Sequence, residues 1–194
     1  MTAGRPEDAK QTIYGHSSLL HEAGVVGRIF SWMLRRRQKM AVGAGAPSSV
    51  QVVEVEVDTL LGHVRVDKVH TGLAVGKLAA PVLAHSQAVG AVIQGIGYAL
   101  YEGREVDPLT GVILTAGLED YRIPGIADTP SIEVHFDEAG FDHVLGGGVG
   151  VGEVATIPTA AAIANAVRNA IGVRPTDIPI RADRLLALLQ GTVR

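Results

Sequence analysis

The chain has 194 residues, of which 47% are apolar and 4% aromatic, with 24 glycines and a formal net charge of −3. This composition is typical of a folded chain with a buried core and excludes a disordered one. Cysteine is absent, which excludes disulfides, thiolate-bound zinc, iron–sulfur clusters and a cysteine nucleophile within this chain.

Residues 1–40 are expected to precede the main domain. The region opens with a polar lead-in, and Ser17–Lys39 carries apolar residues at helical spacing, which predicts a helical segment. The short basic cluster Arg35–Arg37 is typical of a solvated helix end, so no nucleic-acid partner is expected. Residues 41–194 are predicted to form one further domain portion.

The sequence predicts no membrane span. No apolar run reaches the roughly 20 residues that cross a bilayer, and Met1–Lys10 is polar, unlike a secretory signal. We therefore expect a cytoplasmic protein, with periplasmic export through a partner's signal as the alternative.

Two segments alternate with a period of two and predict a β-hairpin. Valines alternate with glutamates in Val50–Val57, Asp58–Gly62 has the composition of a turn, and His63–Asp67 alternates again. One face of this hairpin should be buried. Ile132–Phe136 is predicted to form a further strand by the same alternation.

A long helix is predicted from about Val82 to Tyr101. Gln87, Gly90, Gln94 and Gly97 are three, four and three residues apart, which places them on a single helix face. A glycine inside a helix costs about 1 kcal/mol relative to alanine. Two explanations are open: close helix packing, or the approach of a planar or phosphate-bearing ligand with the amides as hydrogen-bonding groups.

The remaining elements are short. Asp107–Gly111 predicts a turn between two short strands, and Leu118–Ile126 is irregular. A helix is predicted over Thr159–Ile171 and ended by Gly172, followed by a short helix over Asp183–Leu189. Together with the strands, these segments predict an α+β fold with mixed sheets and packed helices.

A glycine-rich loop, Gly146–Glu153, could bring its backbone N–H groups close to a ligand. A dinucleotide-binding fingerprint would need a second strand after the following helix. The segment Val173–Pro179 instead holds two prolines, so no such unit can be completed and a nucleotide site is excluded for this loop.

Glu153 is the carboxylate that ends this loop, between glycines and the apolar residues Val154 and Ala155. In such surroundings it should be partly desolvated, which makes a carboxylate a stronger base. The alternative is an acid that is favourably placed near the positive end of the helix beginning at Thr159. Both interpretations are open on physical grounds.

The histidines do not predict a metal site. None of the seven has zinc-type spacing, and no protein ligand to a metal is assigned; they are His16, His21, His63, His70, His85, His135 and His143. His135, Tyr121 and Arg122 are expected to be structural rather than catalytic.

Several motifs resemble one family. The run Gln87–Leu100, the segment Asp120–Pro124, and Gly150–Glu153 followed by Ala161–Val167 resemble the molybdopterin-binding large subunits of the xanthine dehydrogenase/aldehyde oxidase family. The spacing is most similar to that of the bacterial aldehyde-oxidising branch. The resemblance extends from about Tyr14 to Leu189 and implies the fold of the C-terminal portion of such a subunit.

The resemblance implies hydroxylation of an aldehyde or N-heterocycle with water-derived oxygen at molybdenum. Glu153 matches the family's general base, which takes a proton from the attacking oxygen, while the cofactor carries the redox chemistry. The residues implied to contact the cofactor are Gln87, Gly90, Gln94, Gly95, Gly150, Val151 and Gly152.

Family subunits are several times longer, so the resemblance implies partners. The expected cofactor is a molybdenum–pterin cofactor, with its cytosine dinucleotide form as one option, shared with a second molybdopterin-subunit half. Iron–sulfur clusters and FAD are expected on partner subunits only, and the substrate is a small molecule. A fragment of a longer subunit is the alternative to a naturally split one.

The sequence also departs from the family. Ala74 and Ala80 stand where relatives carry Asp and Asn, and Val149 replaces a lysine before the Gly-Val-Gly-Glu motif. Two other functions therefore stay open: a non-catalytic structural or assembly subunit, and a small-ligand-binding module unrelated to molybdenum.

Overall fold

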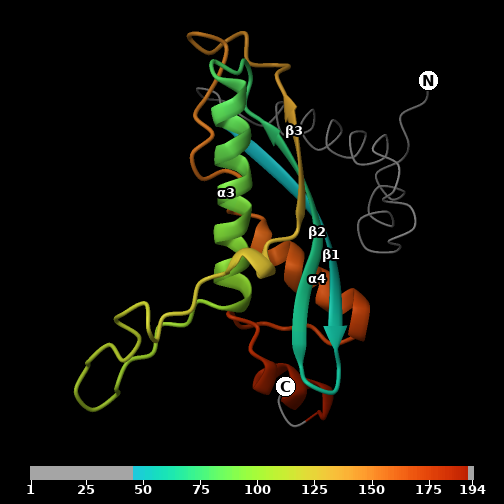
Figure 1. Ribbon diagram of the computed structural model, residues 1–194. Helices are drawn as coiled ribbons and strands as arrows, with labels where there is room; N and C mark the ends of the chain where they lie inside the picture. The colour runs from blue at the N-terminus through green and yellow to red at the C-terminus, as the bar shows by residue number, and fades with distance from the viewer. Residues whose placement is uncertain (1–45, 192–194) are drawn as a thin grey trace.

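A computed structural model describes residues 46–191. The predicted lead-in and the helix over Ser17–Lys39 lie outside the described residues, so the division between 1–40 and 41–194 stays a prediction. Figure 1 shows a three-stranded sheet with two helices packed against it.

The predicted hairpin is confirmed. Strand β1, Ser48–Asp58, pairs antiparallel with β2, His63–Ala74, with a register irregularity between Glu54 and Val55. The Asp58 carboxylate accepts hydrogen bonds from the N–H groups of Leu60 and Leu61 at 2.8 and 3.0 Å, which closes the turn. Strand β2 runs seven residues beyond the predicted end at Asp67.

The third strand makes the sheet mixed. Strand β3, Ser131–Asp137, covers the predicted Ile132–Phe136 and pairs with β2 in parallel, giving the order β1-β2-β3. The parallel pairing requires a long crossover, which contains the helix α3, Pro81–Leu100. The predicted helix over Val82–Tyr101 is therefore confirmed.

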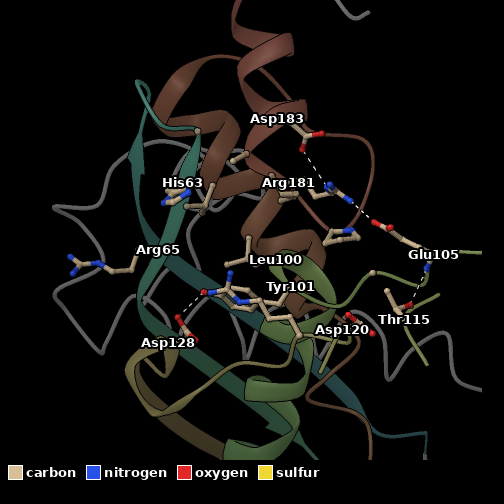
Figure 2. A pocket seen from close by; sticks show the side chains of 17 residues that line it. His63, Arg65, Leu100, Tyr101, Glu105, Thr115, Asp120, Asp128, Arg181 and Asp183 are labelled. Atoms are coloured by element: carbon tan, nitrogen blue, oxygen red, sulfur yellow. Dashed lines mark hydrogen bonds and ion pairs between the residues drawn. The ribbon is translucent and has the colours of Figure 1, made fainter. Parts of the chain in front are cut away.

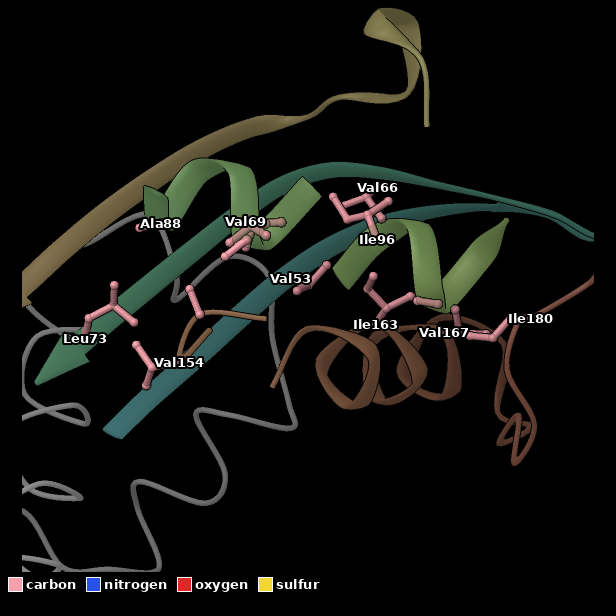
Figure 3. Close-up of a cluster of buried hydrophobic side chains, with 14 of the residues drawn as sticks. Val53, Val66, Val69, Leu73, Ala88, Ile96, Val154, Ile163, Val167 and Ile180 are labelled. Atoms are coloured by element: carbon pink, nitrogen blue, oxygen red, sulfur yellow. The ribbon is translucent and has the colours of Figure 1, made fainter. Parts of the chain in front are cut away.

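The core lies between the sheet and two helices. Helix α4, Thr159–Ile171, packs against α3 and β1, and Gly172 ends it in the left-handed conformation with φ of 78°, as predicted. Val69 and Leu73 of β2, Ile96 of α3 and Ile163 of α4 are all almost fully buried in one cluster (Figure 3). The α+β fold class is confirmed.

The last helix is α5, Ala182–Leu189, where a short helix was predicted. Between α3 and β3 the chain leaves the body as an irregular arm that ends at the short 3-10 helix η2, Ile126–Asp128 (Figure 1). The turn at Asp107–Gly111 is present, but its two predicted flanking strands are reduced to one isolated bridge between Val106 and Ile113. In the described part of the chain, no helix has the length and apolarity needed to cross a membrane.

Candidate cofactor-contacting surface

The polar stripe of α3 is exposed along most of its length. Gln87, Gly90 and Gln94 are exposed, and a Cβ added at Gly90 would meet no atom within 4 Å. Gly97, the fourth member, is buried because the Glu102 side chain and Pro124 cover it. The stripe therefore presents two amides and one bare stretch of helix backbone to the surroundings.

Gly95 lies in the interior, not on this exposed stripe. A Cβ added there would collide with the side chain of Thr159, the first residue of α4. Gly95, which the resemblance assigned to cofactor contact, thus serves close helix packing instead. Packing is one of the two explanations that the sequence left open for Gly90 and Gly97. The other explanation still applies to Gly90.

The glycine loop has two parts, and glycine is required for a different reason in each. Gly147 and Gly148 lie against Lys77: the Lys77 N–H donates to the Gly147 carbonyl at 2.8 Å, and a Cβ at Gly148 would collide with the Lys77 carbonyl. Gly150 and Gly152 are exposed with open space around an added Cβ. Backbone packing thus explains why position 148 is a glycine, but it does not explain Gly150 or Gly152.

Residues 150–153 also present unpaired backbone donors. Within the described ranges, no acceptor takes the N–H groups of these four residues. Val151 is half-buried and packs against the core, which anchors the loop to the core. Consecutive N–H groups without a protein acceptor are suited to binding an anionic or carbonyl-bearing ligand.

One hydrogen bond joins the helix stripe to the loop. The Gln87 amide Nε2 donates to the Gly152 carbonyl at 2.7 Å, across 65 residues of sequence. Farther along the helix, the Gln94 amide donates to the Tyr98 hydroxyl at 2.7 Å. Gln87 of the helix and Gly152 of the loop are therefore adjacent, and the exposed Gly90 and Gly150 belong to the same two segments.

The segment after Glu153 is fixed by two neighbouring elements. From β1, the Ser49 hydroxyl donates to the Val154 carbonyl and the Gln51 amide to the Ala155 carbonyl, both at 2.6 Å. From the other side, the Thr156 hydroxyl donates to the Ala91 carbonyl of α3 at 3.1 Å. Because Val154 and Ala155 are buried, the backbone of Glu153 has little freedom to move.

Glu153 itself is exposed, which corrects the expected desolvation. The apolar neighbours Val154 and Ala155 turn into the core, whereas the carboxylate side chain projects from the loop. The sequence placed the apolar residues next to Glu153 but could not show that they point away from it. Any desolvation of this carboxylate has to come from atoms beyond residues 46–191.

A cavity of about 760 Å³ lies elsewhere, between the hairpin tip, the end of α3 and the start of α5 (Figure 2). Its lining includes Tyr101, which donates to Asp128 at 3.0 Å, and Arg181, which pairs with Glu105 at 2.7 Å. None of the predicted cofactor-contacting residues lines it. Nearby, Tyr121 donates to Glu102 at 2.7 Å, which fits the structural role expected for that tyrosine.

The structure brings together three residues that sequence spacing did not connect. His70 of β2 lies beside Glu133 and His135 of β3, and their ligand-type atoms all fall within 4.8 Å of one another. The two histidines are 65 positions apart and meet only through the parallel strand pair. Only a prediction that β2 extends to Ala74 could have indicated from the sequence that these three residues meet.

Solved structures with the same fold define the class of protein. Quinoline 2-oxidoreductase from Pseudomonas putida 86 superposes with a TM-score of 0.66 and 32% identity over 70% of this chain and 18% of its own. The aldehyde oxidoreductase from Desulfovibrio desulfuricans ATCC 27774 gives 0.68 and 27% over 75% and 16%. The chain therefore has the fold of part of a molybdenum-hydroxylase large subunit.

The family follows from the sequence comparison. The family model described as "Molybdopterin cofactor-binding domain" matches residues 17–130, more than half of the chain, and the chain belongs to that family. The molybdenum-binding subunit PaoC of an aldehyde oxidoreductase from Escherichia coli (strain K12) is 36% identical over 193 residues, which are 96% of this chain and 26% of PaoC. A xanthine dehydrogenase molybdenum-binding subunit of Escherichia coli O157:H7 is 35% identical over 69% of this chain and 18% of its own length. The chain thus spans about a quarter or less of these relatives.

Proposed function

We propose that this chain is the part of a molybdenum hydroxylase that carries the general base, Glu153, and one wall of the cofactor site. The observation that carries the proposal is the hydrogen bond between Gln87 and Gly152, which joins the predicted contact helix to the residue before Glu153. The relatives that support it are named as molybdenum-binding subunits of aldehyde and xanthine oxidoreductases.

The residues present fit a pterin-type cofactor. Such a ligand is planar and rich in hydrogen-bonding groups, so it needs bare backbone to lie against and polar groups at its edges. Gly90, Gly150 and Gly152 offer bare backbone, since an added Cβ at each meets nothing within 4 Å. The N–H groups of residues 150–153 and the exposed amides of Gln87 and Gln94 offer the polar groups.

Gln87, Gly150 and Gly152 would have distinct roles in holding the cofactor. Gln87 holds the loop with one amide N–H, and its carbonyl oxygen, which has no partner among residues 46–191, is left to accept from the cofactor. Gly150 and Gly152 let the cofactor approach the loop backbone. When bound, the molybdenum–pterin cofactor supplies the two-electron acceptor and the site of oxygen transfer.

Glu153 would accept the proton of the oxygen nucleophile. Its backbone is fixed through the buried residues Val154 and Ala155, so its carboxylate is presented at a defined position. A general base must reach its proton within hydrogen-bonding distance, and such rigid placement contributes to that. The substrate class that this chemistry accepts is an aldehyde or an N-heterocycle.

The exposed Glu153 implies a second surface that closes over it. We infer that this surface, and the rest of the cofactor site, belong to a second molybdopterin-subunit half on a separate chain. Iron–sulfur and FAD subunits would take up the electrons, because this chain has no cysteine for a cluster. The cytosine dinucleotide form is the cofactor form that we propose.

Purification of the chain in its native complex tests the proposal. We expect co-purification with a larger molybdenum-binding polypeptide, stoichiometric molybdenum by elemental analysis, and a pterin whose attached nucleotide mass spectrometry identifies as cytidine-type. A complex without molybdenum or pterin would overturn the proposal. A complex that holds both but retains full turnover after Glu153→Gln would instead assign a structural role to this chain.

A further inference from the structure

Two histidines and a glutamate converge on one face of the sheet, apart from the surface described above. Strands β2 and β3 lie side by side (Figure 1). In their parallel pairing, His70 is in register with Glu133, and Gly72 is in register with His135. Val69 and Thr71, on either side of His70, are fully buried. Val69 belongs to the core cluster with α3 and α4, and Thr71 accepts a hydrogen bond from the buried Gln51 amide. Because side chains alternate along a strand, His70, Glu133 and His135 lie on the opposite face of the sheet.

The separations suit the ligands of one transition-metal ion. His70 Nδ1 and a Glu133 carboxylate oxygen are 3.0 Å apart, and the ligand atoms of all three residues lie within 4.8 Å of one another. With metal–ligand bonds of about 2.0–2.2 Å, neighbouring ligand atoms around a tetrahedral zinc ion are roughly 3.4 Å apart. His70 and Glu133 need to separate by only about 0.4 Å to reach this spacing. The exposed His135 can reach it by a change of rotamer.

The surroundings also favour a metal over a purely structural contact. The two strands fix the Cα positions of all three residues, so the ligands are held by a rigid element. His70 is 5% exposed, while the Glu133 side chain is 42% exposed, so the group lies at the boundary between the interior and solvent.

We propose that His70, Glu133 and His135 form a binding site for a divalent transition-metal ion, with zinc the best fit to two imidazoles and one carboxylate. The fourth position would be open to water, since Glu133 and His135 are reachable from solvent. None of its three residues is among those proposed to contact the molybdenum cofactor, and the proposal does not depend on the function proposed for Glu153.

Lys68 competes with a metal ion for the carboxylate of Glu133. Its ammonium nitrogen lies 2.6 Å from the second oxygen of Glu133 and so takes the place of a cation beside that carboxylate. On the other side, Lys68 is in register with Glu54 of β1, which gives it a second carboxylate to pair with when a metal binds. A neutral residue at position 68 should therefore strengthen metal binding.

Zinc titration by calorimetry on the full chain, stripped of metal and near neutral pH, tests the site. We expect one high-affinity zinc ion, with affinity at least about tenfold weaker in His135→Ala and in Glu133→Gln. Lys68→Met should bind roughly tenfold more tightly because it removes a competing charge. His85→Ala, an exposed histidine on α3, is the matched control and should bind as the unaltered chain does.

Thermal unfolding with and without zinc gives a second readout that also shows whether each variant folds. Zinc should raise the Tm of the unaltered chain and of His85→Ala, and leave that of His135→Ala unchanged. Equal zinc affinity in the unaltered chain and in His135→Ala would overturn the proposal. So would a Lys68→Met variant that binds zinc less tightly than the unaltered chain.

Discussion

The Gln87 amide donates a 2.7 Å hydrogen bond to the Gly152 carbonyl, immediately before Glu153. This contact connects α3 to a loop that lies 65 residues later in the sequence, and it fixes the loop from the side of the exposed helix stripe. Ser49 and Gln51 of β1 fix the residues that follow Glu153 from the sheet side. The position of the proposed base therefore depends on both layers of the fold.

Removal of the Gln87 contact should loosen the loop. In Gln87→Ala, the global free energy of unfolding should fall by no more than about 1 kcal/mol, because an exposed hydrogen bond contributes little net stability. Hydrogen exchange at residues 150–153 should become faster, and kcat of the assembled enzyme should fall roughly tenfold through misplacement of Glu153. His85→Ala, on the same helix, should change neither; unchanged exchange in Gln87→Ala would contradict the role given to this bond.

Two of the three glycines of α3, Gly90 and Gly95, should respond oppositely to alanine. Gly90→Ala should stabilise the chain by about 1 kcal/mol, because open space surrounds the new methyl group and alanine favours the helix. Gly95→Ala should destabilise it by about 1–3 kcal/mol, because the new methyl group collides with Thr159. Urea denaturation of both variants measures the difference.

The same pair separates packing from cofactor contact. Gly90→Ala should lower the molybdenum and pterin content of the complex even though the chain becomes more stable. Full cofactor content in Gly90→Ala would remove Gly90 from the proposed contact surface, whatever Gly95→Ala does.

Gln51 should contribute more to the free energy of unfolding than an exposed glutamine does. Its buried amide donates to the Ala155 carbonyl at 2.6 Å and to the Thr71 hydroxyl at 3.2 Å. In Gln51→Leu the buried Ala155 carbonyl loses this donor, which should lower the free energy of unfolding by about 1–3 kcal/mol. Gln94→Leu, where the amide is exposed, should stay within about 0.5 kcal/mol of the original; equal losses in both variants would contradict this account.

The hairpin turn should weaken in acid. The N–H groups of Leu61 and Leu60 hold the pKa of the Asp58 carboxyl below its ordinary value of 3.8. A carboxyl with a lowered pKa in the folded state contributes stability above its unfolded pKa and loses it as the pH falls through the folded one. An NMR titration should therefore give Asp58 a midpoint below 3.8, and Asp58→Asn should remove its share of the acid sensitivity. A midpoint at or above 3.8 would exclude the two N–H contacts in solution.

Regular local patterns in the sequence correctly predicted β1 and α3. The alternation of Val50–Val57 and the helical spacing of Val82–Tyr101 gave β1 and α3 nearly to the residue. The second half of β2 escaped prediction because His70–Ala74 is buried on both faces and so does not alternate. Without that extension, the parallel pair of β2 with β3, and the meeting of His70 with Glu133, could not be predicted.

The candidate site was predictable in composition but not in orientation. The residue types at Gln87, Gly90 and the Gly150–Glu153 motif predicted a ligand contact. In the structure Gln87, Gly90, Gly150, Gly152 and Glu153 are exposed, and Gln87 is hydrogen-bonded to Gly152. The direction of the Glu153 side chain depends on which neighbours enter the core, and that is decided by β1 and α4. For the same reason Gly95 could not be separated from Gly90 until Thr159 was seen to fill the space beside it.

Turnover of the assembled complex carrying Glu153→Gln tests the central claim most directly. Glutamine keeps the shape of the side chain but cannot accept a proton, so kcat should fall by roughly 10²–10⁴-fold while molybdenum and pterin content stay at the level of the unaltered complex. Glu138→Gln, an exposed acid after β3, should leave kcat unchanged. A Glu153→Gln complex with full cofactor content and undiminished kcat would contradict the assignment of Glu153 as the base.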